Sequence, residues 1–328
     1  MSVTLTTPCV HIEQAVPDLA AAVRFMERVL GAQKIEQELV RFINDPVHRV
    51  LELDHLDCGE AVFQFCMPVP GHDYMPAAQY LKTIGPCVTN LNFYVDDDAH
   101  AAALLAAEGA DTGSKFAMHL MFWDRLLGGT ENCKPSEEMG DGYFMGTRHL
   151  WGFDFEFAKE PWKGCTKQRI QYPAFVTPRP PSASRVGRVR RLRVVVEDVQ
   201  RCCANLTRLI SASSRSEVYA THEGTQAKVA HITLRGLELQ YCQPLGHKGP
   251  LHDYLQRYGQ GISAVVFPVM HLETILAAAD QQALAAVDGT YVDWREELGE
   301  QTPPWSLPRT YRLASRGTLG FDIELAES

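Results

Sequence analysis

The sequence predicts an α+β protein of four βαβββ modules, paired into two open, cupped mixed β-sheet barrels with helices outside. Two internal repeats carry the prediction. The segment GFDFEFA at residues 152–158 returns as GFDIELA at residues 320–326, and QFCMPVPGH from Gln64 returns as QYCQPLGH from Gln240. Matches that recur in the same order indicate a duplicated architecture. The chain is therefore expected to contain two copies of one design.

Each copy contains two modules, and each module opens with a strand that runs straight into an amphipathic helix. In the first module VHIEQAV at residues 10–16 precedes Pro17, Asp18 and a run of apolar residues at helical spacing that ends near Gly31. Proline at the start and glycine at the end are typical helix boundaries. The same succession occurs at residues 90–110, 191–210 and 264–282. After each helix there is room for about three strands of ordinary length.

A proline-rich segment separates the two copies. Four prolines lie between residues 173 and 181, which predicts an extended linker. We therefore expect an N-terminal domain at residues 1–160, a linker at 161–187 and a C-terminal domain at 188–328.

Composition restricts the classes of function. A chain of 328 residues with 45% apolar content can form two cores of ordinary domain size. It contains no apolar stretch long enough to cross a bilayer and no signal-peptide pattern, which predicts a soluble, cytoplasmic protein. The nine cysteines lack CxxC spacing and are expected to be reduced. A net charge of -9 without a basic stripe argues against nucleic acid or membrane as partner, and favours a small-molecule substrate.

The predicted strands each have one polar and one apolar face. In VHIEQAV the side chains of His11 and Glu13 share a face, because strand residues alternate between the two sides of a sheet. Module helices would cover the apolar faces, so the polar faces of two paired modules would surround a shared cavity. The polar positions on the other strands of this half are Gln64, Asn90, Asn92, Asp154 and Glu156.

The first module resembles the vicinal oxygen chelate superfamily, which includes glyoxalase I, methylmalonyl-CoA epimerase and the extradiol dioxygenases. The resemblance rests on a strand, Val-Pro-Asp-Leu, a helix and Leu-Gly, with His11 eight positions before Leu19. The module pattern extends it over nearly the whole chain, although only the first module carries the signature closely. It implies the paired βαβββ fold and a cavity that holds a divalent metal.

The resemblance also implies four ligand positions, which fall here on His11, Gln64, Asn90 and Glu156. Imidazole, amide and carboxylate groups suit an ion such as Mn²⁺, Fe²⁺, Co²⁺, Ni²⁺ or Zn²⁺. Asn90 departs from the family pattern, which usually has histidine there. Three alternatives follow: three protein ligands with water, substitution by His119 or His149, or no metal at all.

The matching positions of the second half are Arg191, Gln240, Ala264 and Glu324. This set lacks an imidazole, so the second half is not expected to bind a metal. We predict that Arg191 pairs with Glu324 in its place. The alternative is that Arg191 binds a carboxylate of the substrate.

For the reaction, the resemblance implies proton abstraction and enolate stabilisation on a small oxygenated substrate, by an isomerase, epimerase or lyase. Glu156 is then the expected base, with Glu13 or Asp154 as alternatives. His149 and Tyr143 are candidate proton donors. A homodimer is possible, although one chain can complete the cavity.

Two other functions remain open. The first is an extradiol ring-cleaving dioxygenase with Fe²⁺, which would need a further imidazole, such as His252 or His271, in place of Ala264. The second is a metal-free protein that binds a small hydrophobic compound, with Trp123, Trp151 and Phe65 in its cavity. The survival of His11, Gln64 and Glu156 together in one half favours the metal-dependent enzyme.

Overall fold

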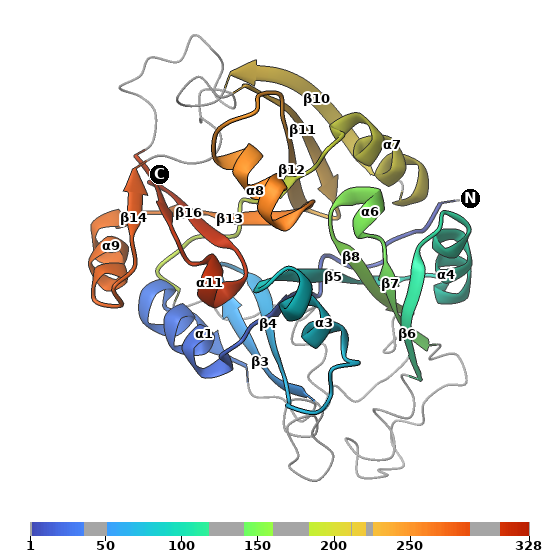
Figure 1. Cartoon of the computed structure of the whole chain (residues 1–328), viewed down its shortest axis with the longest axis horizontal. Helices are drawn as coiled ribbons and strands as arrows, with labels where there is room; N and C mark the ends of the chain where they lie inside the picture. The colour runs from blue at the N-terminus through green and yellow to red at the C-terminus, as the bar shows by residue number, and fades with distance from the viewer. Residues whose placement is uncertain are drawn as a thin grey trace.

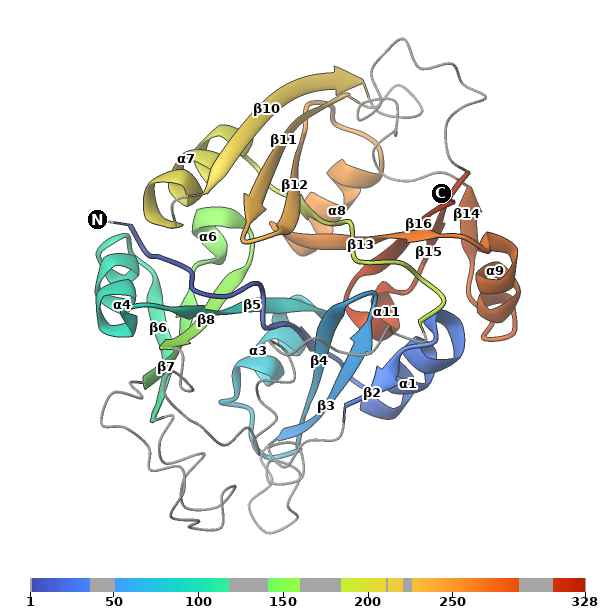
Figure 2. The same ribbon diagram turned by 180° about the vertical axis from the view of Figure 1, so that it is seen from behind.

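The computed structural model contains two eight-stranded mixed sheets, one in each half of the chain (Figures 1 and 2). It describes residues 2–35, 51–117, 141–159, 184–210, 212–220, 226–288 and 309–327. The strands of the first sheet lie between residues 11 and 159 and those of the second between 191 and 327. The expected linker lies mostly outside the described residues.

The first half contains two βαβββ modules. Its elements are β1 (His11–Ala15), α1 (Leu19–Phe25), the π-helical turn η1 (Met26–Leu30), β2 (Gln33–Lys34), β3 (Leu51–Cys58), β4 (Ala61–Pro68), α3 (Pro76–Thr83), β5 (Cys87–Val95), α4 (Asp98–Ala107), β6 (Asp111–Ala117), β7 (Asp141–Gly146), α6 (Arg148–Trp151) and β8 (Asp154–Lys159). The short helices α3 and α6 are additions to the predicted pattern.

The second half repeats this succession. Its elements are β9 (Arg191–Val195), α7 (Val199–Ile210), β10 (Ser213–Ala220), β11 (Gln226–Leu234), β12 (Leu237–Pro244), α8 (Pro250–Tyr258), β13 (Gly261–Val269), α9 (Leu272–Asp280), β14 (Ala286–Asp288), β15 (Thr310–Leu313), α11 (Arg316–Leu319) and β16 (Asp322–Glu327). The four-module α+β architecture predicted from the sequence is confirmed.

Both sheets have the same strand order, which is β2-β3-β4-β1-β5-β8-β7-β6 in the first and β10-β11-β12-β9-β13-β16-β15-β14 in the second. The first strand of each half lies at the centre, parallel to the last strand of its own module and antiparallel to the first strand of the next. Side chains on β1 therefore face neighbours from both modules. Polar side chains on β1 can therefore form a site together with residues of both modules.

Local sequence signals explain the start and end of the first helix. The Asp18 carboxylate accepts a hydrogen bond from the backbone N–H of Ala21 at 2.8 Å and so caps α1. At the end of η1, Gly31 adopts a left-handed conformation with φ of 70°. Asp97 caps α4 in the same way, through the N–H of His100. Each helix thus begins where the sequence pattern places it.

The apolar faces of the two sheets belong to one continuous core. Phe63 on β4 packs against two rings of the other half, with ring-centroid distances of 5.8 Å to Phe321 and 6.2 Å to Phe267. Around this core the helices lie outside, with η1 beside α9 and α6 beside α7 (Figures 1 and 2). The sequence predicted helices over these faces. The structure shows in addition that side chains of the two halves pack against each other in this core.

Gly320 is required where the halves meet. Its φ is 84°, and a Cβ atom there would lie 2.7 Å from the backbone of Cys87. We expect Gly320→Ala to lower the free energy of unfolding by at least about 1–3 kcal/mol. Alanine is strained at this left-handed φ, and its Cβ would also clash with the backbone of Cys87. Urea denaturation measures this. Gly85→Ala, with φ of 91° but open space around it, should cost less; equal losses would contradict the role of the contact.

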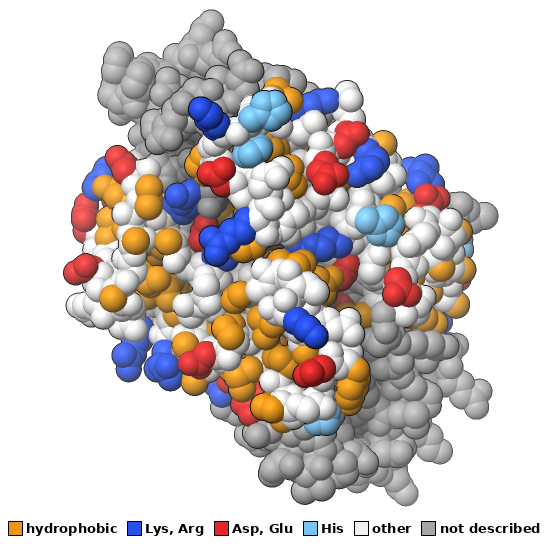
Figure 3. All heavy atoms as spheres, in the orientation of Figure 1, with side chains coloured by type: hydrophobic (Ala, Val, Ile, Leu, Met, Phe, Trp, Pro, Cys, Tyr) orange, Lys and Arg blue, Asp and Glu red, His pale blue; other side chains and the backbone are white. Residues whose placement is uncertain are grey.

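The described surface carries charges of both signs. On the face seen in Figure 3, basic and acidic side chains are interspersed, without a continuous basic stripe. No described helix is long and apolar enough to cross a membrane. All seven cysteines that the structure describes are free thiols.

Candidate metal centre

His11, Glu13 and Glu156 converge on the polar face of the first sheet. β1 directs His11 and Glu13 to this face, while Ile12 between them enters the core. On β5, Asn92 lies opposite His11 and in turn beside Glu156 of β8. The three strands thus place His11 and Glu156 in one row across the sheet.

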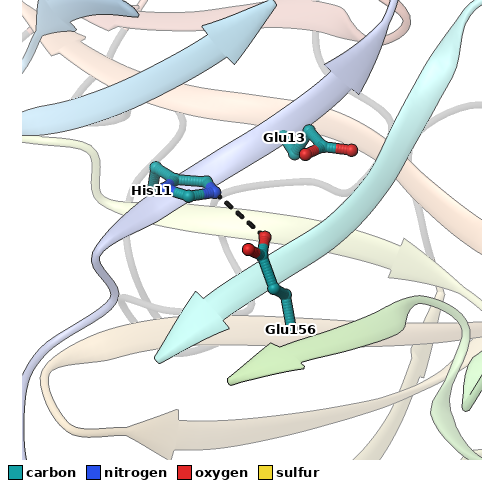
Figure 4. Close-up of side chains that lie close together, drawn as sticks. All are labelled: His11, Glu13 and Glu156. Atoms are coloured by element: carbon teal, nitrogen blue, oxygen red, sulfur yellow. Dashed lines mark hydrogen bonds and ion pairs between the residues drawn. The ribbon is translucent and has the colours of Figure 1, made fainter. Parts of the chain in front are cut away.

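The donor atoms of these three side chains lie within 4.8 Å of one another. His11 Nε2 is 3.2 Å from Glu156 Oε2, and the Glu13 carboxylate faces the same space (Figure 4). All three residues are buried, with exposed fractions of 1%, 7% and 5% in the order His11, Glu13, Glu156. It is the one such group of histidine, cysteine and carboxylate side chains within the described part of the chain.

Neutral donors hold the carboxylate of Glu13. Its Oε2 accepts a hydrogen bond from Gln64 Nε2 at 2.6 Å, and its Oε1 accepts one from the Thr89 hydroxyl at 2.8 Å. Burial raises the pKa of Glu13 to about 7, and the charge of Glu156 acts in the same direction. His11 and the hydrogen bonds from Thr89 and Asn90 lower that pKa, but less strongly.

Two buried carboxylates share this site, and no lysine or arginine of the described residues pairs with them. Among the described residues, the ion pair of Glu156 is with His11, and Glu13 makes none. Burying two negative charges together is costly unless a cation neutralises them. A divalent ion would do so with one imidazole nitrogen and two carboxylate donors, a set that suits Mn²⁺, Fe²⁺, Co²⁺, Ni²⁺ or Zn²⁺. The residues present therefore fit a metal.

The expected ligands Gln64 and Asn90 take other contacts in this structure. Gln64 Oε1 lies 2.6 Å from His55 Nε2 while its Nε2 donates to Glu13, so both ends of the amide are engaged. Asn90 Nδ2 donates to the Thr89 hydroxyl at 3.4 Å. Glu13, expected as an alternative base, instead completes the cluster.

Tyr143 and His149 lie apart from the cluster. The Tyr143 ring is in the core on the apolar face, stacked on Phe157 at 5.4 Å, and so does not face Glu156. Its role as proton donor stays a prediction. His149 is exposed on α6, whereas the clustered side chains are buried. His119 lies outside the described residues.

Asp154 has an equivalent residue in the second half, Asp322, which makes the same backbone contact. Asp154 Oδ1 accepts the backbone N–H of Arg148 at 3.0 Å, and its Oδ2 accepts the hydroxyl of Tyr80. Asp322 accepts the N–H of Arg316 in the same manner at 3.2 Å. Burial raises the pKa of Asp154 to about 7. The repeated cap indicates a structural role rather than that of the alternative base.

The aromatic residues proposed for a metal-free cavity lie elsewhere. Phe65 is fully buried and stacks on Phe63 in the core. Trp151 is also fully buried, with its ring edge-on to Phe155 at 6.1 Å. Trp123 lies outside the described residues. The two described residues therefore do not line the polar face that carries His11.

In the second half an arginine occupies the corresponding space. Arg193 donates to Glu324 Oε2 at 2.5 Å and to Gln240 Oε1, and all three side chains are buried. Arg191 pairs instead with Glu238 at 3.1 Å. The arginine that the structure shows on Glu324 is thus Arg193, two residues along the strand from the predicted Arg191.

The strand register explains why Arg193 lies near Glu324. Arg193 is the counterpart of Glu13, and it lies directly opposite Ala264 on β13. The small side chain of Ala264 leaves the guanidinium space to reach Glu324. The candidates His252 and His271 lie at the start of α8 and before α9, and His271 is exposed.

Sequence reasoning missed His55, which is fully buried beside Gln64, with its ring centroid 5.8 Å from that of His11. The spacing offered a signal, because His55 precedes Gln64 by nine residues and His231 precedes Gln240 by nine. Both pairs face each other directly across their strands.

Comparisons with known proteins agree with this architecture. Residues 9–124 match the model of the Glyoxalase/Bleomycin resistance protein/Dioxygenase superfamily. No curated protein sequence matches the chain significantly.

Two solved structures share the fold. A triple mutant of 4-hydroxymandelate synthase from Streptomyces coelicolor superposes with a TM-score of 0.62 at 13% identity, over 98% of this chain and 93% of the other. A xylose isomerase-like TIM barrel/4-hydroxyphenylpyruvate dioxygenase fusion protein superposes with a TM-score of 0.52 at 11% identity, over 100% of this chain and 50% of the other.

Proposed function

We propose that this chain is a divalent-metal-dependent enzyme with one active site, in its N-terminal half. The support is the match of residues 9–124 to the Glyoxalase/Bleomycin resistance protein/Dioxygenase superfamily and the fold shared with a solved 4-hydroxymandelate synthase. The chemistry that fits best is proton transfer at carbon in a small oxygenated substrate, as in an isomerase, epimerase or lyase.

One observation carries this proposal: His11, Glu13 and Glu156 converge, buried, around a common point. The equivalent space in the second half is filled by the Arg193 guanidinium on Glu324. The second half thus neutralises its buried carboxylate with a built-in cation, whereas in the described part of the first half no lysine or arginine pairs with Glu13 or Glu156. A metal ion would supply the missing positive charge.

His11 and Glu156 would hold the ion together with Glu13. When bound, a divalent ion polarises neighbouring substrate oxygens and stabilises the negative charge that develops when a proton leaves carbon. Glu13 is the residue placed to accept that proton, because its carboxylate reaches the cluster while Gln64 and Thr89 fix its orientation. The buried setting around these residues excludes bulk water.

We expect the Mn²⁺-loaded protein to exchange a carbon-bound proton of its substrate with D₂O. Glu13→Gln should slow this exchange about 10²- to 10⁴-fold, the usual contribution of a general base. The Mn²⁺ content of the same sample is measured, because Glu13 is also a member of the metal cluster and its loss as a base has to be separated from its loss as a donor. Proton NMR on a panel of small 2-oxo acids and 2-hydroxy ketones measures the exchange. His149→Ala is the control. Exchange that persists unchanged in Glu13→Gln would remove Glu13 from this role.

A dioxygenase is the second candidate, because nearly the whole of this chain superposes on parts of proteins named as a 4-hydroxymandelate synthase and a 4-hydroxyphenylpyruvate dioxygenase fusion. The described cluster contains one imidazole, whereas the common non-haem iron site has two imidazoles and one carboxylate. Oxygen uptake by the Fe²⁺-loaded protein with catechol or 4-hydroxyphenylpyruvate would favour this candidate over proton transfer.

A further inference from the structure

A row of three side chains runs from β3 to the group formed by His11, Glu13 and Glu156. His55 on β3 lies opposite Gln64 on β4, and Gln64 lies beside Glu13 on β1. His55 Nε2 is 2.6 Å from Gln64 Oε1, and Gln64 Nε2 is 2.6 Å from Glu13 Oε2. His55 is fully buried, and Gln64 is 8% exposed. The three residues form a continuous hydrogen-bonded chain.

The chemistry of the groups fixes the direction of this chain. In its ionised form Glu13 only accepts hydrogen bonds, so the amide nitrogen of Gln64 faces Glu13 and its oxygen faces His55. His55 must then donate through an N–H at Nε2. A reversed amide would set its oxygen against the Glu13 carboxylate, and two acceptors repel. His55 therefore determines which way the amide of Gln64 points.

We propose that His55 is a positioning residue, which orients the Gln64 amide and through it holds the Glu13 carboxylate toward His11 and Glu156. The inference rests on the proposed function, because the carboxylate it positions belongs to the proposed metal centre. Residues that orient metal ligands in this way typically affect metal affinity about 10- to 100-fold.

The second half has the same histidine and glutamine positions with an arginine in place of Glu13. His231 and Gln240 occupy the same cross-strand positions. There Gln240 Oε1 accepts from Arg193, and His231 Nδ1 lies 2.9 Å from Glu238. The amide oxygen of Gln240 thus accepts from an arginine, where that of Gln64 meets His55 and its nitrogen donates to a glutamate.

Mn²⁺ binding by purified full-length variants tests the proposal. We expect His55→Leu to weaken Mn²⁺ affinity about 10- to 100-fold. His55→Gln, which keeps an N–H donor for Gln64, should restore most of it. His231→Leu, the matched change in the other half, should leave it unchanged. Isothermal titration calorimetry gives the affinities, and far-UV circular dichroism with urea denaturation verifies that each variant is folded.

Equal affinity in wild type and His55→Leu, or an equal loss in His231→Leu, would overturn the proposal. A second readout needs no metal. Nitrogen-15 NMR of the imidazole in metal-free protein should show the proton of His55 on Nε2, and a proton on Nδ1 alone would overturn the assignment. If wild type binds no Mn²⁺ but His55 is protonated at Nε2, the metal function fails while the orienting contact stands.

Discussion

Protein purified without chelator is expected to contain about one divalent metal ion per chain, and Glu156→Gln or His11→Ala should abolish this binding. Each change removes a donor from a cluster whose three members lie within 4.8 Å. Glu156→Gln also removes one of the two negative charges that attract the ion. The single carboxylate that remains attracts a divalent ion less strongly than two carboxylates do.

Inductively coupled plasma mass spectrometry gives the metal content, and titration with Mn²⁺ or Fe²⁺ gives the capacity. His149→Ala is the control, because His149 is exposed on α6. It should bind the metal like wild type. A wild-type protein that holds no metal, and takes up none when Mn²⁺ or Fe²⁺ is added, would contradict the proposed function.

Arg193→Met is expected to lower the free energy of unfolding by about 3–5 kcal/mol. The substitution removes the Arg193 guanidinium from the buried carboxylate of Glu324, and also removes the donor to Gln240. Removal of one partner from a buried ion pair costs more than the pair contributes, because the remaining charge has lost its water and gained nothing.

The double variant Arg193→Met with Glu324→Leu separates this cause from lost packing. It removes both charges and should recover most of the stability, as apolar replacements of buried ion pairs often do. Arg309→Met provides the surface comparison, since Arg309 pairs with Glu273 in solvent and should leave the urea midpoint nearly unchanged. An Arg193→Met protein as stable as Arg309→Met would show that the buried pair does not hold the second half together.

The two-copy architecture was predictable because its signals are local. Strand alternation put His11 and Glu13 on one face and Ile12 on the other, and this holds in the structure. The aspartate at position 18 and the glycine at 31 marked the ends of the first helix by their own backbone chemistry. Such features depend on neighbours in sequence and need no knowledge of distant contacts.

The hydrogen-bond partner of each polar side chain could not be predicted as well from the sequence. The sequence placed Gln64 on the correct face but could not show that its amide is turned toward Glu13 and His55. Likewise the sequence pointed to Arg191 as the partner of Glu324, and could not show that Arg193 donates to that carboxylate. Both residues are on the same face of β9 and have equal reach, so the choice depends on the small Ala264 across the strand pair.

The sequence by itself determined that there are two copies, which strand faces are polar, and that the copies differ in the charge of their first strands. The tertiary structure decided which atoms meet: a histidine and two glutamates in one half, an arginine and a glutamate in the other. Face and period are properties of a few consecutive residues. Contact depends on cross-strand register and on the space left by neighbours far away in the chain, and only the folded sheet fixes these.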